Sequence, residues 1–214
     1  MSNLKRSFII IICGFLCIAV AVAITGYNFY TDAMAGKQSK EALEEIIVEI
    51  QDNQQKTENQ NITPDYLINP KMDMPKIEVN HNYYIGYLEI PALGLKLPVL
   101  DELSYYNLNI APCRYKGTAY LDNMVIAAHN FQSHFGNISQ LSIGDEIIFT
   151  DIDGNVFLYE VADFESLRGT QVEDMTNSDY ELTLFTCNYD GSLRVTMRCT
   201  RVPRTQFGQT ASSD

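Results

Sequence analysis

The sequence is poor in positive charge and has no internal repeat or low-complexity tract. Its 214 residues include 15 lysines and arginines against 27 aspartates and glutamates, which leaves a formal net charge of −12. Such a balance repels a phosphate backbone, so the composition excludes nucleic acid as a partner. With 46% hydrophobic and 11% aromatic residues, the chain has enough apolar material for one packed domain, an anchor and a linker.

Charge is absent altogether from the apolar run at residues 8–24. With its flanks this run approaches the roughly 20 residues that a bilayer requires, so we predict a transmembrane anchor over residues 8–30. A cleaved signal peptide is the alternative, because residues 33–35 (Ala-Met-Ala) have the small-x-small form of a cleavage site. The apolar run is longer than the roughly 7–15 residues of a signal core, which favours the anchor.

The few basic residues near this run predict its orientation. Lys5 and Arg6 precede it, and the first basic residue after it is Lys37. The positive-inside rule therefore places residues 1–7 in the cytoplasm and the rest of the chain outside the membrane.

Residues 31–81 are expected to form a helix followed by a linker. Within residues 39–51, apolar side chains recur at three- and four-residue spacing, which predicts a helix that packs on the domain or self-associates. These residues are Ala42, Leu43, Ile46, Ile47 and Ile50. The polar run at 51–61 and the prolines that follow it predict an extended linker with little structure.

Residues 82–204 are expected to form an all-β domain, followed by a tail at 205–214. Short apolar and β-branched runs are broken by turn residues every 8–12 positions, and residues 151–154 (Asp-Ile-Asp-Gly) predict a hairpin turn. Closure into a barrel or a sandwich would remove the open strand edges. The predicted strands are 84–90, 95–100, 124–128, 146–150, 156–166, 182–186 and 193–201, with a short helix or loop at 134–141.

Three cysteines follow the apolar run, and an odd number in an exported protein invites a chemical explanation. Cys187 ends an apolar strand and precedes a polar turn, a place where a thiol is exposed yet firmly held. Cys113 lies in a loop and Cys199 within a strand, so they are weaker candidates for a nucleophile. Whether these two form a disulfide depends on their distance.

A cysteine nucleophile needs a nearby histidine or another cation, and the chain has only three histidines. His129 ends one predicted strand and opens a polar loop, which matches the placement of Cys187. His81 lies in the predicted linker, and His134 lies within a loop. A histidine at a strand end is more often structural, but two strand ends that meet at one barrel rim favour a catalytic pair.

Acyl chemistry also requires a donor for the developing oxyanion. Arg194 follows Cys187 across a turn that contains Asp190 and Gly191, so a hairpin would return its side chain toward the thiol. Arg198 and Arg201 are the alternatives on the same strand. For these two we expect a solvated strand edge, where charge prevents aggregation.

These residues resemble the motifs of the sortases, membrane-anchored cysteine transpeptidases of Gram-positive bacteria. Residues 183–187 (TLFTC) look like the TLxTC signature, 193–195 (LRV) like the arginine strand, and 128–130 (AHN) like the histidine segment. Residues 84–91 (YIGYLEIP) and 97–99 (LPV) resemble the first strands of that fold. The match spans roughly residues 83–203 in the family's order.

The resemblance implies a closed eight-stranded β-barrel and a two-step transfer. Cys187 would attack an LPxTG-like sorting signal to form a thioacyl enzyme, which a cell-wall precursor or pilin amine resolves. His129 would be the acid and base, and Arg194 would hold the oxyanion. Neighbouring motif residues, namely Ala128, Asn130, Leu184 and Thr186, are expected to contact the substrate. No metal or organic cofactor is implied, and no calcium-loop pattern is recognisable.

Departures from the family pattern bear on the subclass. No Asp-Pro-aromatic lid precedes the first strand, which argues against a pilus-polymerising type. Residues 168–180 are short for the inserted helix of haem-acquisition types, so we expect a housekeeping-like or class D-like enzyme. Two rival functions remain: an exported cysteine peptidase that only hydrolyses, and a non-catalytic, membrane-tethered β-domain that binds a partner.

Overall fold

The computed structural model describes residues 2–60 and 63–203, and the predicted tail at 205–214 lies outside these residues. The chain divides into two compact units, Met1–Met34 and Ala35–Asp214. Helix α1 (Ser2–Gln60) provides the described residues of the first unit and opens the second.

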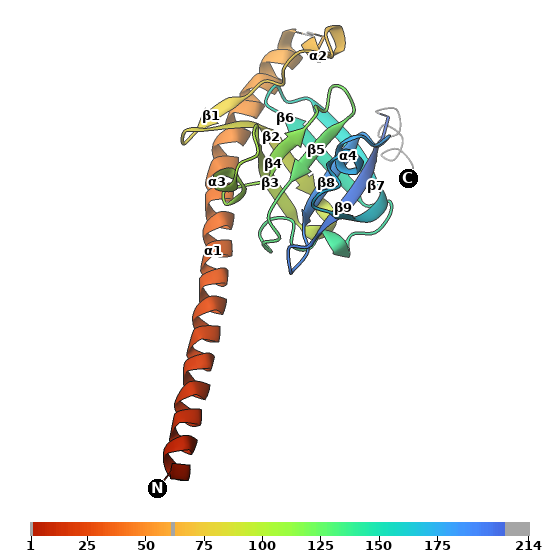
Figure 1. The fold of residues 1–214 in the computed structure, drawn as a ribbon. Coiled ribbons are helices and arrows are strands. Elements are labelled where there is room, and N and C mark those ends of the chain that lie inside the picture. Colours follow the sequence, from red (N-terminus) through yellow and green to blue (C-terminus); the bar gives the residue numbers. More distant parts are fainter. Residues whose placement is uncertain (1, 61–62, 204–214) are drawn as a thin grey trace, which may run out of the picture. The chain divides into compact units, whose positions relative to one another are not determined.

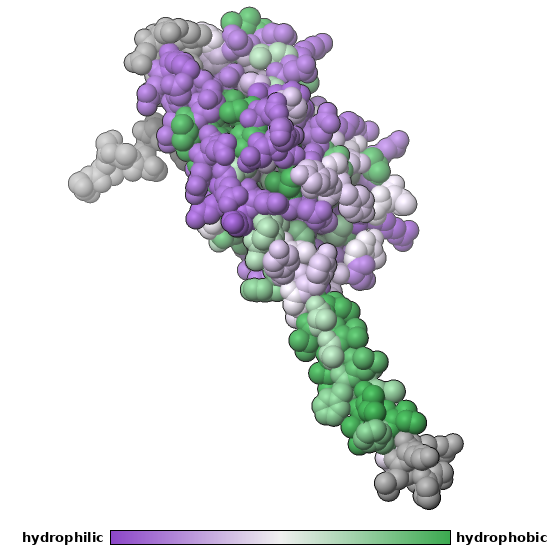
Figure 2. Space-filling model, turned by 90° about the vertical axis from the view of Figure 1, so that its left-hand side faces the viewer, coloured by the Kyte–Doolittle hydropathy of each residue, from purple (hydrophilic) through white to green (hydrophobic). Residues whose placement is uncertain are grey.

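The first unit is an apolar stretch of α1. From Ser7 to Tyr30 every side chain is exposed, including large apolar ones such as Phe8 and Phe29. The most apolar 18-residue window of this helix has a mean hydropathy of 3.0, and Figure 2 shows its continuous green surface. By length and composition, the helix can therefore cross a bilayer.

Nine strands form one sheet in the second unit, and eight of them close into a barrel (Figure 1). The order is β1-β2-β3-β4-β5-β8-β9-β7-β6, and β2 also pairs with β6. This last pairing places Leu88 opposite Phe149 and closes the ring, so the predicted eight-stranded barrel is confirmed. The strands are β1 (Ile77–Val79), β2 (Asn82–Ile90), β3 (Leu95–Leu100), β4 (Cys113–Lys116), β5 (Met124–Ala127), β6 (Glu146–Asp151), β7 (Val156–Arg168), β8 (Leu182–Cys187) and β9 (Leu193–Arg201).

All seven predicted strands are present, and their bounds agree within two residues. The sequence pattern missed β1 and β4, which at three and four residues are too short to show a clear alternation. Residues 134–141 contain a single 3-10 turn, as expected for a short helix or loop. The short helices are α2 (Asp65–Ile68), η1 (Pro91–Leu93), α3 (Tyr105–Leu108), η2 (Ile138–Gln140) and α4 (Val172–Thr176).

The main core fills the inside of the barrel. Along β8, Leu182 and Leu184 point inward and are fully buried, whereas Phe185 lies on the other face and is half-buried. Inward residues of the other strands, such as Phe149 and Met197, belong to the same buried cluster. Because strand side chains alternate, every second residue of a barrel strand is available for an outer surface.

The part of α1 in the second unit packs on the outside of the barrel. Ala42, Ile46 and Ile50 form a buried cluster with residues of β2 and β3, including Tyr84 and Leu100. The predicted helix over residues 39–51 is thus confirmed, and its apolar stripe covers the barrel.

The expectation of an unstructured linker after this helix is wrong. Helix α1 continues to Gln60, and its polar side chains bond to the hairpin between β6 and β7. Asn53 Nδ2 donates to Ile152 O at 3.1 Å, and Gln54 Nε2 donates to Gly154 O at 3.0 Å. These amides satisfy hairpin carbonyls, a role that a polar run does not reveal in the sequence.

The proline-containing segment that follows is also held on the barrel. The ring of Tyr66 stacks on Tyr120 with centroids 4.8 Å apart, and Met74 is buried in the main core. The described part of residues 63–76 is therefore attached to the barrel and does not act as a free spacer.

Candidate active site

The register of β8 and β9 places Cys187 opposite an arginine. Cys187 is the last residue of β8, and its antiparallel partner on β9 is Arg194. Directly opposite residues of an antiparallel pair point to the same face of the sheet. The hairpin predicted from the sequence therefore brings these two side chains together on the outer face of the barrel.

The register of β5 and β8 brings His129 to the same place. These strands are parallel, and Ala127 pairs with Phe185. Ala128 N donates to Phe185 O at 3.1 Å, which extends the ladder past the end of β5. Counting two residues onward on each strand, His129 and Cys187 occupy equivalent positions, so their side chains share one face.

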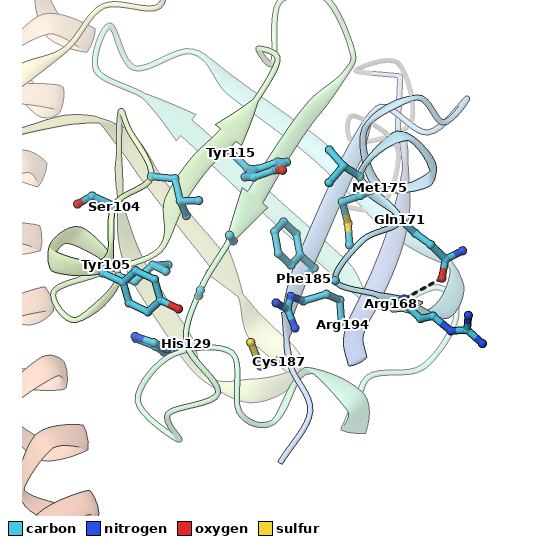
Figure 3. A pocket seen from close by; sticks show the side chains of 16 residues that line it. Ser104, Tyr105, Tyr115, His129, Arg168, Gln171, Met175, Phe185, Cys187 and Arg194 are labelled. Atoms are coloured by element: carbon cyan, nitrogen blue, oxygen red, sulfur yellow. Dashed lines mark hydrogen bonds between the residues drawn. The ribbon is translucent and has the colours of Figure 1, made fainter. Parts of the chain in front are cut away.

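His129, Cys187 and Arg194 line one cavity of about 410 Å³. Figure 3 shows Cys187 between His129 and Arg194, with Phe185 and Tyr115 farther along the wall. Tyr115, Phe185 and Met175 of the cavity lining belong to a small apolar cluster that also contains Val125 and Leu167. Residues of the β3–β4 loop with α3 and of the β7–β8 segment with α4 form the sides: Leu103, Ser104, Tyr105, Leu108, Arg168, Gly169, Gln171 and Val172.

Burial favours the neutral imidazole of His129. The side chain is half-buried, and burial lowers its pKa from the ordinary value of 6.5. The ring of Phe131 lies 4.8 Å from the imidazole, centroid to centroid. Among the described residues no carboxylate pairs with His129, so at neutral pH its ring can accept a proton.

The guanidinium of Arg194 retains free donors. Its Nη1 donates to Gly191 O at 3.1 Å and to Leu193 O at 3.4 Å. Within residues 2–60 and 63–203, no carboxylate forms an ion pair with it. A Cβ atom on Gly169 would lie 3.2 Å from Arg194 Nη2, so the missing side chain leaves room for the guanidinium. Sequence reasoning missed Gly169, because nothing near it in the chain indicates this contact.

The other cysteines differ from Cys187 in their surroundings. Cys113 and Cys199 are buried and unpaired, and they lie in separate core clusters. Burial raises the pKa of each thiol to about 12, so neither supplies thiolate at neutral pH. Cys187 is half-exposed at the cavity wall.

The remaining histidines lie apart from this cavity lining. The side chain of His81 is fully exposed in the turn before β2 and lies 3.6 Å from Glu78. His134 is buried in the loop that follows β5.

The expectation of solvated strand-edge charges at Arg198 and Arg201 is wrong. Arg198 is only 1% exposed and bonds to Glu165 and to backbone carbonyls of α4. Arg201 is partly buried; it pairs with Asp122 and lies over the ring of Phe157. Arg198 is covered by α4 on the outer face of β9. Arg201 is on the opposite face of the strand, where it lies over a core ring, so alternation along β9 alone does not indicate either environment.

Of the four residues predicted to contact the substrate, only one lines the cavity. Ala128 lines the cavity. Leu184 and Thr186 point to the buried side of β8, where Thr186 Oγ1 donates to Ala128 O at 2.9 Å. Asn130 is exposed and lies outside the cavity lining. Because side chains alternate along β8, Phe185 shares the face of Cys187, and the sequence analysis missed it.

Comparison with known proteins gives the family of this chain. The family model of the sortase domain matches residues 88–202. Sortase A of Bacillus anthracis is 25% identical over 199 residues, which cover 86% of this chain and 89% of that protein. The solved sortase D5 transpeptidase of Clostridium perfringens has a TM-score of 0.57 at 19% identity, over 78% of this chain and 99% of that chain.

A sortase C from Clostridium perfringens, solved with the C-terminal cell wall sorting motif, has a TM-score of 0.51 at 23% identity. The match covers 76% of this chain and 90% of that chain. Both solved structures share the barrel fold described above. Because the family model covers more than half of the sequence, this chain belongs to the sortase family, a family of cysteine transpeptidases.

Proposed function

We propose that this chain is a membrane-anchored sortase in which Cys187 is the nucleophile, His129 carries protons and Arg194 binds the oxyanion. The observation that carries the proposal is the strand register. Cys187 and His129 occupy equivalent positions at neighbouring strand ends, and Arg194 lies opposite Cys187, all in one cavity.

In the first step, His129 accepts the thiol proton of Cys187, and the thiolate attacks the carbonyl carbon of the Thr–Gly bond in an LPxTG-like signal. Free donors of Arg194 stabilise the oxyanion, a contribution of about 3 kcal/mol for one donor in comparable sites. When the intermediate collapses, the carbon–nitrogen bond breaks and the leaving amine takes the proton from His129. A thioester on Cys187 remains.

In the second step, an amine attacks the thioester carbonyl. His129, neutral again, accepts the proton of the attacking amine. Collapse of the second intermediate breaks the carbon–sulfur bond, and the Cys187 thiolate recovers its proton from His129. The net change is exchange of one amine for another, and no cofactor takes part. The acceptor is a cell-wall precursor or a pilin amine.

The cavity walls support an apolar sorting signal. Tyr115, Phe185, Val172 and Met175 offer apolar surface that suits the leucine and proline of an LPxTG-like sequence. The solved sortase C that carries a C-terminal cell wall sorting motif shares this fold. The missing lid motif and the short β7–β8 segment favour a housekeeping-like or class D-like enzyme.

The proposed location is the cell membrane, with the N-terminus in the cytoplasm and the barrel outside. Lys5 and Arg6 before the apolar run support this orientation. The rival cleavage site at residues 33–35 lies within continuous helix, and Ala35 is only 2% exposed. Both features favour a retained anchor over a cleaved signal peptide.

Mass spectrometry of the full chain in detergent micelles tests the function. The protein is incubated with LPxTG-type peptides, with and without oligoglycine or other amines, and Cys187→Ala is the control. We expect peptide joined to the amine, and no product from the variant. Hydrolysis alone with every amine would favour a cysteine peptidase. No cleavage across a broad peptide panel would favour a non-catalytic binding module.

A further inference from the structure

Small residues face the barrel in the first turns of α1 that belong to the second unit. Ala35, Ser39 and Ala42 are each only 2% exposed. Their spacing puts them on one side of the helix, and short side chains allow the helix backbone to approach the barrel closely. Gly36 lies beside this row and has no side chain at all.

Gly36 contacts the loop that carries His129. A Cβ atom on Gly36 would lie 2.9 Å from Ser133 Cβ and 3.4 Å from Ser133 Oγ. Ser133 Cβ is fixed to its own backbone, so rotation of the side chain cannot relieve the first contact. Any residue larger than glycine at position 36 must therefore displace either the helix or the loop.

The helix is the more firmly held of the two partners. Ile46 and Ile50 are buried against the barrel, and Asn53 and Gln54 bond to the β6–β7 hairpin. A displacement of the helix at Gly36 would strain these contacts. Added volume at residue 36 therefore bears on the loop at Ser133.

The loop transmits such a shift to His129. Phe135 N donates to His129 O at 3.2 Å, and Gly136 N donates to Phe131 O at 2.8 Å. The ring of Phe131 also packs on the imidazole of His129. Residues 129–136 therefore form one compact turn, anchored by the fully buried Phe135, in which Ser133 and His129 move together.

We propose that α1 positions the imidazole of His129 through the contact of Gly36 with Ser133, so that the anchor helix is part of the support of the active site. Gly36 is a positioning residue in this scheme, since it does not touch the substrate. The proposal rests on the proposed catalytic role of His129. It predicts that added volume at residue 36 lowers turnover while substrate binding at the opposite cavity wall is kept.

The test uses the full chain in nanodiscs, with Gly36→Ala and Gly36→Leu. Gly26→Ala is the matched control, because it is the same change in the same helix and no atom lies within 4 Å of a Cβ there. Gln38→Leu, on an exposed position of α1, controls for leucine. Alanine favours helix over glycine, so a loss of activity would not arise from a weaker helix.

Two readouts are recorded for each variant: kcat and KM for peptide transfer, and the pH titration of His129 followed by the NMR signals of 13C-labelled histidine. Three histidines make the assignment direct. We expect Gly36→Leu to lower kcat roughly ten- to hundred-fold with KM within about twofold. The His129 signal should shift, and Ser133→Gly should restore both kcat and the signal in the Gly36→Ala background, measured relative to Ser133→Gly alone.

Equal kcat and equal His129 signals in Gly36→Leu and the two controls would overturn the proposal. A loss that Ser133→Gly fails to relieve would overturn it as well, because the effect would not pass through this contact. If the unaltered chain transfers no peptide, the proposed function fails, and the NMR comparison still decides whether Gly36 positions His129.

Discussion

Replacing Arg198 with methionine removes a cation that supports one wall of the active-site cavity. The guanidinium bonds to the carboxylate of Glu165 at 2.8 Å and to Met175 O at 3.1 Å. It also bonds to Asp174 O, Ser178 Oγ and Thr183 Oγ1. These partners join β7, β8 and α4 to β9, and α4 supplies Met175 to the cavity.

The expected loss is about 3 kcal/mol in the free energy of unfolding. Two backbone carbonyls of α4 lose a charged donor, and an unsatisfied buried acceptor costs about 1–3 kcal/mol. The side chain of Glu165 is 36% exposed, so water can replace part of its ion pair, which keeps the loss at the lower end of the range for broken buried pairs. For a domain of this size, 3 kcal/mol corresponds to a fall in Tm of about 6–12 °C.

Thermal unfolding and peptide-transfer kinetics of Arg198→Met check this estimate. We expect KM to rise more than kcat falls, because α4 lines the substrate wall and does not carry a catalytic group. Arg201→Met is the matched control, since Arg201 is on the same strand and lies outside the cavity lining. A Tm within about 2 °C of the unaltered protein, or a KM change no larger than in the control, would show that Arg198 does not support this wall.

Three further outcomes follow from the site. His129 should titrate below 6.5 in an NMR titration, because burial lowers its pKa. The unfolded state then binds the proton first, so the unfolding free energy should fall as the pH drops from about 6.5 to the folded pKa. A stability difference between the protein and His129→Gln that does not change with pH would contradict this. Alkylation at pH 8, mapped by peptide mass spectrometry, should modify Cys187 well before Cys113 and Cys199, because burial raises the pKa of the latter two thiols to about 12. Comparable alkylation rates at all three cysteines would be inconsistent with the burial of Cys113 and Cys199. Arg194→Ala should lower kcat roughly 10²–10³-fold, with partial recovery in Arg194→Lys, whereas an unchanged kcat would exclude an oxyanion role.

Local sequence patterns identified most strands and all three proposed catalytic groups. Alternation of apolar residues marked the strands, and the change from an apolar run to a polar turn marked Cys187 and His129 as strand-end residues. Arg194 followed from the short distance along the chain across one hairpin. These inferences concern neighbours in sequence or residues with a distinctive chemical type.

The same patterns do not predict which segments far apart in the sequence pair or pack together. The parallel register of β5 and β8, which aligns His129 with Cys187, joins segments about 58 residues apart. Burial of Arg198 depends on α4 covering the outer face of β9, and the helical state of residues 51–60 depends on a hairpin about 100 residues later. Leu184 was predicted to contact the substrate because it lies in the TLxTC-like motif, but strand alternation places it on the buried side of β8.

In the proposed mechanism Cys187 carries the acyl group, which intact-mass spectrometry without any amine acceptor can detect. The full chain in micelles is mixed with an LPxTG-type peptide, quenched in acid and then digested. We expect a mass increase equal to the acyl fragment ending at threonine, located on Cys187 and discharged by added amine. An acyl adduct on a different residue, or none at Cys187 across a broad peptide panel, would contradict it.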